Sequence, residues 1–517
     1  MVSAAFNLLP SDDIELTIDE PDSHSPHVQI SDLKEYDPGK TSYRIALGGL
    51  FFSTIFTIAC IGAGIGTLGS LVNFILGSAF LMTPTTAMVV DSTIADLPSL
   101  GLNLLVTTCT ESIGFIHSKL LQAALISEHN IQFNTNLRLI PRPRSGRSWT
   151  HPNGTFSNVI MGILLILSYV SSSLVFAQNQ PGDPIIRIKL QSPALIVLGV
   201  ALLLQALIAY LGMRRESIFT WSSSPFHTTA ALLYHNQLIH KSGKCMHNVL
   251  HSDSFIDPCT PSILQPSVWQ VSSSVRRIVI GLWCLWPACA VWSGIVIGIG
   301  KRTGQLVVGS IIGSTLGMGS WSPLPNTNTS LLVVASSFQT SIVVMAALQG
   351  PLTMALHCCE LLVNLLRDEA AWRKAVEKLG APWSKNPLLS ALMNKQSVGL
   401  FVVKSVLYWM FGLSLGYGAE GLSDNALFMR PVQILYLSAA LLLLAAGYTF
   451  MVTRQPSGCQ PATYGHLQTL ANLIDDWSPL MWWGHKGGGQ ICHAGTSDHP
   501  LPHVNMNTLY AGNSQDR

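Results

Sequence analysis

The sequence predicts an all-α, polytopic membrane protein with about eight transmembrane helices (seven to nine) and a helical layer on the cytoplasmic side. Charge is scarce, since 11% of the 517 residues are charged and soluble domains carry about 25%. Hydrophobic residues make up 48%, and the mean hydropathy is +0.38. They gather in runs of about 20 residues, the length that a helix needs to cross a hydrocarbon core of about 30 Å. The lipid bilayer is therefore the expected partner. The net charge of +2 does not indicate the basic face that nucleic acid requires, so we expect no nucleic-acid partner.

Eight apolar runs are long enough to be spans. They cover residues 45–68, 98–122, 157–177, 193–212, 277–299, 331–351, 399–417 and 432–452. Two features leave alternatives open. The apolar stretch 45–82 is compatible with one long helix or with two helices broken between Gly62 and Gly69. Residues 304–320 are short for a span, and we expect them to be re-entrant or to lie on the outer surface.

The distribution of lysine and arginine predicts that both termini are cytoplasmic. Sixteen basic residues fall in one set of loops, and five fall in the alternate set. Cytoplasmic loops carry an excess of basic residues, so the first set is assigned to the cytoplasm. The sequence predicts an integral, multi-pass protein but does not separate the plasma membrane from an endomembrane.

Three regions follow from this topology. The first 44 residues hold nine acids and three bases, a composition that predicts a disordered acidic tail and no cleavable signal peptide. The other two regions are the transmembrane domain 45–452, with cytoplasmic loops 123–156, 213–275 and 352–398, and the cytoplasmic C-terminal segment 453–517.

The sequence bears on two kinds of covalent modification. None of the ten cysteines falls in a predicted outer loop, so we expect no disulfide framework. Asn328 begins the sequon Asn328-Thr329-Ser330 in the longest outer loop and is a candidate N-glycosylation site.

Residues 464–477 (YGHLQTLANLIDDW), beyond the last span, show an apolar periodicity that predicts an amphipathic helix. Its apolar face carries the candidate docking residues Leu467, Leu470, Ile474 and Trp477. Helices that lie on a membrane surface carry Lys or Arg on the polar face, whereas this one carries two aspartates. The face therefore predicts packing on the protein's own cytoplasmic loops or on a protein partner.

Glu111, His117 and Lys404 form the candidate intramembrane polar cluster. An ionisable side chain within a bilayer costs at least about 2.5 kcal/mol, so we expect it to face the bundle interior and to have a partner. Counted from the cytoplasmic ends of their spans, Glu111 and Lys404 lie at similar depth, and we predict that they pair or share a hydrated crevice. A structural ion pair, a Lys404 that extends to the headgroups, and a proton or substrate relay are the alternatives. The spacing of Glu360 and Arg367 on one helix face predicts that Arg367 neutralises Glu360.

Little chemistry is indicated elsewhere. His247 and His251 are four residues apart, but no paired Cys-x-x-Cys accompanies them, so no metal site is predicted. Gly487–Gly489 and nearby prolines predict an irregular chain around the C-terminal histidines. The sequence has no nucleophile elbow, phosphate-binding loop or zinc-protease helix. We therefore predict no catalytic residues and no cofactor, and the sequence argues against an enzyme.

Five blocks between residues 98 and 511 carry a resemblance to a known family. They are TTCTESIGFIHSKLLQAALISEHNIQFNTNLRLI, FTWSSSPFHTTAALLYH, LQGPLTMALHCCELLVNLLRDEAAW, YGHLQTLANLIDDWSPLMWWGHK and CHAGTSDHPLP. These blocks resemble a family of uncharacterised multi-pass membrane proteins of mushroom-forming (basidiomycete) fungi. The resemblance implies a helical membrane fold and a fungal origin, makes the C-terminal helix part of the domain, and carries over no activity and no functional residues.

Two classes of function remain from the sequence. The first is a non-enzymatic scaffold, assembly or sensing component with a protein partner at the cytoplasmic face, indicated by the large cytoplasmic share of the chain. The alternative is a transporter or channel that uses a polar crevice around Glu111, His117 and Lys404. The sequence favours the first, because it contains no internal repeat and no matched pair of broken helices.

Overall fold

The computed structural model describes residues 36–75, 87–91, 96–139, 154–178, 185–251, 258–303, 331–335, 337–382, 394–420, 423–488 and 490–511. Most of the predicted acidic tail, the short run 304–320 and the sequon at Asn328 lie outside these residues.

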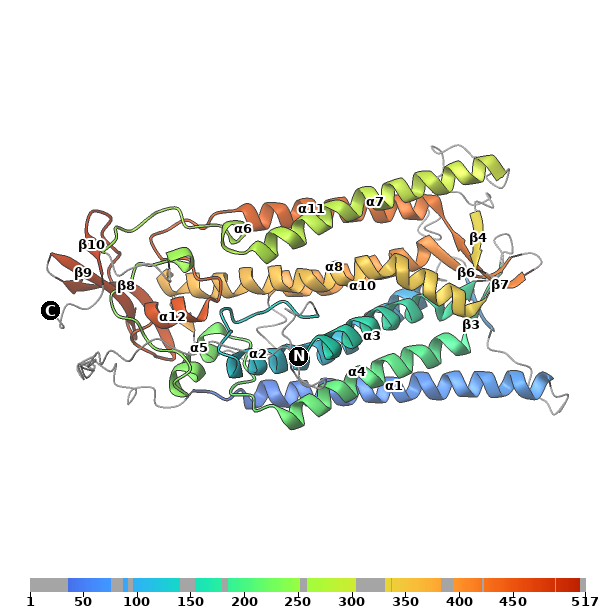
Figure 1. Ribbon diagram of the computed structural model, residues 1–517, viewed down its shortest axis with the longest axis horizontal. Coiled ribbons are helices and arrows are strands. Elements are labelled where there is room, and N and C mark those ends of the chain that lie inside the picture. Colours follow the sequence, from blue (N-terminus) through green and yellow to red (C-terminus); the bar gives the residue numbers. More distant parts are fainter. Residues whose placement is uncertain are drawn as a thin grey trace, which may run out of the picture.

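Within the described residues, eight helices are long and apolar enough to cross a membrane. They are α1 (Lys40–Ile75), α2 (Leu97–Ser127), α3 (Thr155–Leu174), α4 (Ser192–Arg215), α7 (Ser273–Thr303), α8 (Phe338–Arg373), α10 (Lys395–Ser414) and α11 (Pro431–Thr453). The helices run side by side along the long axis of the molecule (Figure 1). The predicted helical membrane fold with about eight spans is thereby confirmed.

The first apolar stretch is one helix as far as residue 75, without a break between Gly62 and Gly69. Glycine here allows helices to approach closely. A Cβ placed on Gly64 would lie 2.6 Å from Ile196 Cγ1 of α4, and one placed on Gly199 of α4 would lie 2.5 Å from Ile61 Cγ1 of α1. Small residues at such positions let two helix backbones pack tightly in a membrane. The glycines thus join α1 to α4 and do not end the helix.

Strands, which the sequence analysis does not predict, cover the end of the bundle that we call the strand end. One sheet has the order β1-β3-β2 and the other has the order β4-β7-β6, and all their pairs are antiparallel. The six strands are β1 (Ala87–Asp91), β2 (Phe176–Gln178), β3 (Ile185–Leu190), β4 (Leu331–Ala335), β6 (Leu415–Glu420) and β7 (Ser423–Met429).

The boundaries of the sixth span differ from the prediction of 331–351. Its first five residues form β4, and α8 begins after Ser337, whose side chain accepts a hydrogen bond from the Thr340 N–H at 3.3 Å. Helix α8 then continues through Pro351 to Arg373. The predicted loop 352–398 is therefore helical over more than half of its length, because the apolar stripe of the span continues past the proline.

The opposite end of the bundle carries what we call the C-terminal layer, formed by described residues of 216–272, 374–382 and 454–511 (Figure 1). Its helical elements are α5 (Pro225–Tyr234), η2 (Val249–His251), α6 (Val268–Val271), η3 (Lys374–Val376) and α12 (Leu467–Leu473). Its sheet has the order β10-β9-β8-β5, with β5 (Ala381–Pro382), β8 (Leu480–Gly488), β9 (Ile491–Ser497) and β10 (Leu509–Tyr510). The prediction of an irregular chain around Gly487 is wrong: Gly487 and Gly488 have φ of 117° and 137° and lie where the hairpin β8–β9 turns.

Helix α12 is shorter than the predicted 464–477 and covers Leu467–Leu473. Tyr464 and Gly465 have φ of 47° and 70°, so the helix cannot begin there. The ring of His466 caps it by accepting from the Thr469 N–H at 3.3 Å. At the other end Ile474 is extended, with φ of −106° and ψ of 105°.

The candidate docking face is covered by the protein itself. Leu467, Leu470 and Ile474 are buried, and Trp477 packs against the same core. Leu470 and Ile474 share a cluster with Trp372 at the end of α8. This face is therefore part of the interior of the C-terminal layer.

One carboxylate fastens the C-terminal segment to α8. Glu369 accepts hydrogen bonds at 2.8 Å from the N–H groups of Thr463 and Tyr464 and at 2.7 Å from Arg373 Nε. The described N-terminal end lies at the same end of the bundle, because the Tyr36 hydroxyl is 2.9 Å from His235 Nε2. Both ends of the described chain thus lie at the same end of the bundle, in agreement with eight candidate spans.

Candidate functional site

Five titratable side chains meet inside the bundle and form what we call the charge cluster. Lys404 Nζ of α10 lies 2.5 Å from Glu111 Oε1 of α2 and 2.5 Å from Glu360 Oε1 of α8. Arg138, from the segment that follows α2, forms an ion pair with Glu360, and His357 Nδ1 is 3.1 Å from Glu360 Oε1. When His357 is neutral, the two negative charges of Glu111 and Glu360 balance the two positive charges of Lys404 and Arg138. The cluster is therefore internally neutralised, as charges inside a membrane protein need to be.

The structure brings Glu111 and Lys404 together, and Lys404 is buried inside the bundle. The predicted pairing of Glu360 with Arg367 is wrong. Arg367 Nη2 instead lies 3.1 Å from Asp368 Oδ1. Seven residues of helix separate Glu360 from Arg367 by about 10 Å along the axis, whereas Arg138 folds back directly onto Glu360.

The two carboxylates of the charge cluster differ in how well they are satisfied. Glu360 contacts Arg138, Lys404 and His357. Among the described residues, Glu111 has one direct charged contact, with Lys404. The Glu111 side chain is also 35% exposed, against 3% for Lys404. Glu111 is thus the open carboxylate of the cluster.

His117, the third predicted residue, is buried near the charge cluster but makes no direct contact with Glu111 or Lys404. Neither of its ring nitrogens has a hydrogen-bond partner within the part of the chain that the structure describes. Its ring lies within electrostatic range of Arg138 and His357. The Nε2 of His357 also has no partner among the described residues. Buried polar atoms are rarely left unpaired, so the open ring nitrogens of His117 and His357 indicate places for water or a ligand.

Polar groups continue from the charge cluster toward the strand end. The Tyr169 hydroxyl of α3 is 2.8 Å from Thr110 Oγ1 and donates to Thr107 Oγ1 at 3.4 Å. One turn further, Ser172 Oγ donates to Asn103 Oδ1 at 3.0 Å. From Asn103 to His117 these groups extend about 21 Å along α2. We call this set, together with the charge cluster, the polar seam.

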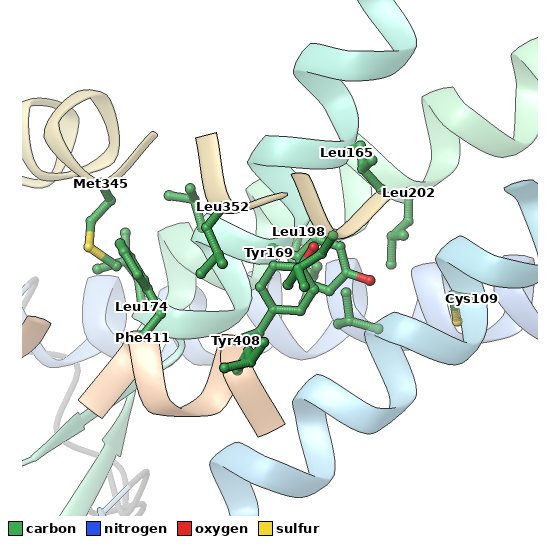
Figure 2. Close-up of a cluster of buried hydrophobic side chains, with 14 of the residues drawn as sticks. Cys109, Leu165, Tyr169, Leu174, Leu198, Leu202, Met345, Leu352, Tyr408 and Phe411 are labelled. Atoms are coloured by element: carbon green, nitrogen blue, oxygen red, sulfur yellow. The ribbon is translucent and has the colours of Figure 1, made fainter. Parts of the chain in front are cut away.

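Aromatic and aliphatic side chains close the middle of the polar seam. The rings of Tyr169 and Tyr408 stack with centroids 3.6 Å apart and an interplanar angle of 19°. Figure 2 shows the two rings among apolar side chains, with Leu174, Leu352 and Phe411 on one side. These residues are buried, so the seam is tightly packed at this level. Beyond them, Gln349 of α8 is fully buried, and its carboxamide has no partner among the described residues.

A second polar network lies between the charge cluster and the C-terminal layer. Lys119 donates to Gln122 Oε1 at 2.9 Å, and Asn134 Nδ2 donates to Asp368 Oδ2 at 2.8 Å. Thr228 of α5 completes it by donating to Asn134 Oδ1 at 2.8 Å. The network joins α2, α8 and α5, so it holds the layer against the bundle.

Sequence reasoning missed Arg138, His357, Glu360 and Tyr169 as members of the site. A signal existed on α8, where Gln349, Thr353, His357 and Glu360 recur at intervals of three or four residues and so share one face. Arg138 gave no signal, because it belongs to a loop whose basic residues were explained by topology.

Comparisons with protein-family models, curated proteins and solved structures give no match. Among the described residues, no group of three or more His, Cys, Asp or Glu side chains is arranged to hold a metal ion. All ten cysteines carry free thiols. The site must therefore be interpreted from its own geometry.

Proposed function

We propose that this multi-pass membrane protein is a transporter or channel that moves a small cation through the bundle, with the Glu111 carboxylate as its binding group. The observation that carries the proposal is the contrast within the charge cluster: Glu111 is 35% exposed and has one direct charged contact among the described residues, while its partner Lys404 is buried. A carboxylate at this depth is costly in lipid, so its exposed surface requires water or a cation.

The chemistry of the open groups favours a cation over an anion. Lys404 and Arg138, the bases of the charge cluster, are buried and already occupied by carboxylates and a carbonyl oxygen. Glu111 is the member of the charge cluster whose side chain is the most exposed. An anion would have to displace Glu111 from Lys404, whereas a cation meets an available acceptor.

The scaffold hypothesis loses one support, the docking face, and keeps the other, the large share of the chain outside the spans. Its candidate docking residues are Leu467, Leu470, Ile474 and Trp477, and the protein's own side chains cover this face. A protein partner at another surface of the C-terminal layer stays a prediction. So does a cytoplasmic location of that layer, which is supported by basic residues such as Arg214, Arg215, Arg276 and Arg277 at its end of the bundle.

The test is charge movement across a membrane. The purified protein is reconstituted in liposomes adsorbed on a solid-supported electrode, and gradients of Na⁺, K⁺ and H⁺ are imposed in turn. We expect a current with at least one cation in the wild type and its loss in Glu111→Gln. Glu377→Gln, the same change at an exposed glutamate of the C-terminal layer, is the matched control and should keep the current. No current with any cation, or a full current in Glu111→Gln, contradicts the proposal.

A further inference from the structure

The contacts of the charge cluster form a chain that ends at an unpartnered histidine. Glu111 contacts Lys404, Lys404 contacts Glu360, and Glu360 contacts His357, each within 3.1 Å. On the far side of His357, its Nε2 and both ring nitrogens of His117 have no partner among the described residues. The chain therefore leads from the more exposed carboxylate of the charge cluster toward two buried imidazoles with open nitrogens.

We propose that the transported cation is the proton, and that it passes between Glu111 and the C-terminal layer through Lys404, Glu360, His357 and His117. This inference rests on the proposed function and specifies its substrate. Water between His357 and His117 would complete the relay, since a buried water takes two to four hydrogen bonds from otherwise unsatisfied groups.

Every transfer along this chain balances. A proton on Glu111 passes to Lys404 Nζ while Lys404 gives one of its own protons to Glu360, so the ammonium group is kept. Glu360 passes the proton to His357 Nδ1, and the proton on His357 Nε2 leaves to the water. The water passes a proton to one ring nitrogen of His117, and the other ring nitrogen releases its proton to water on the side of the C-terminal layer. The His357 ring returns to its first tautomer before the next transfer. No step needs a co-reactant other than water.

The packing of the seam favours a proton over a metal or organic cation. Tyr169 and Tyr408 stack at 3.6 Å beside buried Leu352 and Phe411, so the centre is filled. A hydrated ion or an amine needs a cavity of its own size to pass this level. A proton moves by exchange between touching groups, and the hydroxyls of Tyr169, Thr110 and Thr107 extend such contacts toward the strand end.

The titratable groups within electrostatic range of the relay come from five helices and one loop. They are Glu111 and His117 of α2, Tyr169 of α3, His357, Cys358, Cys359 and Glu360 of α8, Lys404 and Tyr408 of α10, Tyr448 of α11, and Arg138. Arg138 forms an ion pair with Glu360 and lies within electrostatic range of His117, so its positive charge opposes a second excess proton in this part of the relay.

The experiment measures which ion carries the current in the unmodified protein. In liposomes loaded with a pH-sensitive dye, we expect the voltage of zero current to follow the imposed pH gradient and to ignore Na⁺ and K⁺ gradients. We expect internal pH to change in step with the charge moved. His117→Gln should lower the proton flux at least tenfold, and His503→Gln, a change at an exposed histidine, should leave it unchanged.

The outcomes separate the two proposals. A current that follows Na⁺ or K⁺ without a change of internal pH overturns the proton inference and leaves the proposed function standing. A proton current that His117→Gln leaves intact overturns the route. If His117→Gln does not elute as a folded protein, His357→Gln serves as the second variant, and the reversal voltage of the wild type still decides which ion moves. No current at all contradicts the proposed function itself.

Discussion

Glu111 in the polar seam and Glu369 at the end of α8, where the C-terminal layer packs, are both partnered carboxylates, yet they are satisfied very differently. Glu369 accepts hydrogen bonds from two backbone N–H groups and from Arg373. Within the described part of the chain, Glu111 has one direct charged contact, with Lys404. A carboxylate with several strong donors is fixed in its position, whereas one with a single donor keeps acceptor capacity. The comparison teaches where this protein uses charge for structure and where charge is available for transport.

The largest expected effect tests the structural side of this comparison. Leu470→Asp puts a carboxylate into the apolar core formed by α12, Phe226 and Trp372. We expect the free energy of unfolding to fall by about 4 kcal/mol, from the lost side-chain burial and the unpaired charge. Denaturant titration in lipid–detergent micelles measures the change. Leu379→Asp, at a position that is 82% exposed, is the matched control; equal stability of the two variants would refute the buried position of α12.

The second prediction compares the two carboxylates directly. Glu369→Gln removes a charged acceptor from two N–H groups and an arginine, and we expect it to lower the free energy of unfolding by about 2 kcal/mol. Glu111→Gln removes one exposed contact and should cost less than half of that in the same titration. The order for transport is the reverse, because Glu111→Gln should abolish the cation current and Glu369→Gln should spare it in folded protein. If the same variant showed both the larger loss of stability and the larger loss of current, the division of roles between Glu111 and Glu369 would be wrong.

The third prediction concerns pH and an ion pair of the C-terminal layer. His493 Nε2 lies 2.8 Å from Asp475 Oδ2. Burial on its own lowers the pKa of His493, but the hydrogen bond to Asp475 outweighs it and raises the pKa from 6.5 to about 9. The protonated pair therefore stabilises the layer fully below about pH 6.5, and this contribution is lost as the pH rises through about 9.

The check is the difference in thermal midpoint between the wild type and His493→Gln from pH 6 to pH 10. We expect the difference to shrink as the pH rises. Burial also acts against the charge of Asp475, but hydrogen bonds and charges from His493 and Lys486 lower its pKa well below 3.8. The contribution of Asp475 is therefore present above that value and is lost in acid. A difference that does not change with pH would contradict the ion pair.

The smallest expected effect concerns the turn that leads into α12. Gly465 has φ of 70°, and a Cβ there would lie 2.7 Å from Asp368 Oδ2. Gly465→Ala should lower the free energy of unfolding by about 1 kcal/mol, since a left-handed backbone disfavours a side chain. Gly447→Ala, where a Cβ meets nothing within 4 Å, is the control in the same titration. Equal free energies of unfolding for the two variants would show that the turn at Gly465 does not disfavour a side chain.

The spans were predictable because their length is set by the bilayer, and the approach of Glu111 and Lys404 followed from their similar depth. Glu360 was assigned to Arg367 because spacing along one helix is visible in a sequence, whereas the return of Arg138 from a distant loop is not. The strands could not be predicted for a similar reason. Strand β8 depends on pairing with β9, and the glycines that suggested an irregular chain make the turn between them. Contacts between distant segments, rather than local propensity, determine both the Arg138–Glu360 ion pair and the β8–β9 hairpin.

The most direct test of the account is whether Glu111 takes up a cation from water. Infrared difference spectra of the reconstituted wild-type protein, recorded between neutral and acidic buffer, report protonated carboxyl groups through their C=O stretch. We predict a reversible band that is absent from Glu111→Gln and present in Glu377→Gln. If the spectra of all three proteins are the same, Glu111 does not exchange protons with the solvent, and the polar seam is a structural ion pair.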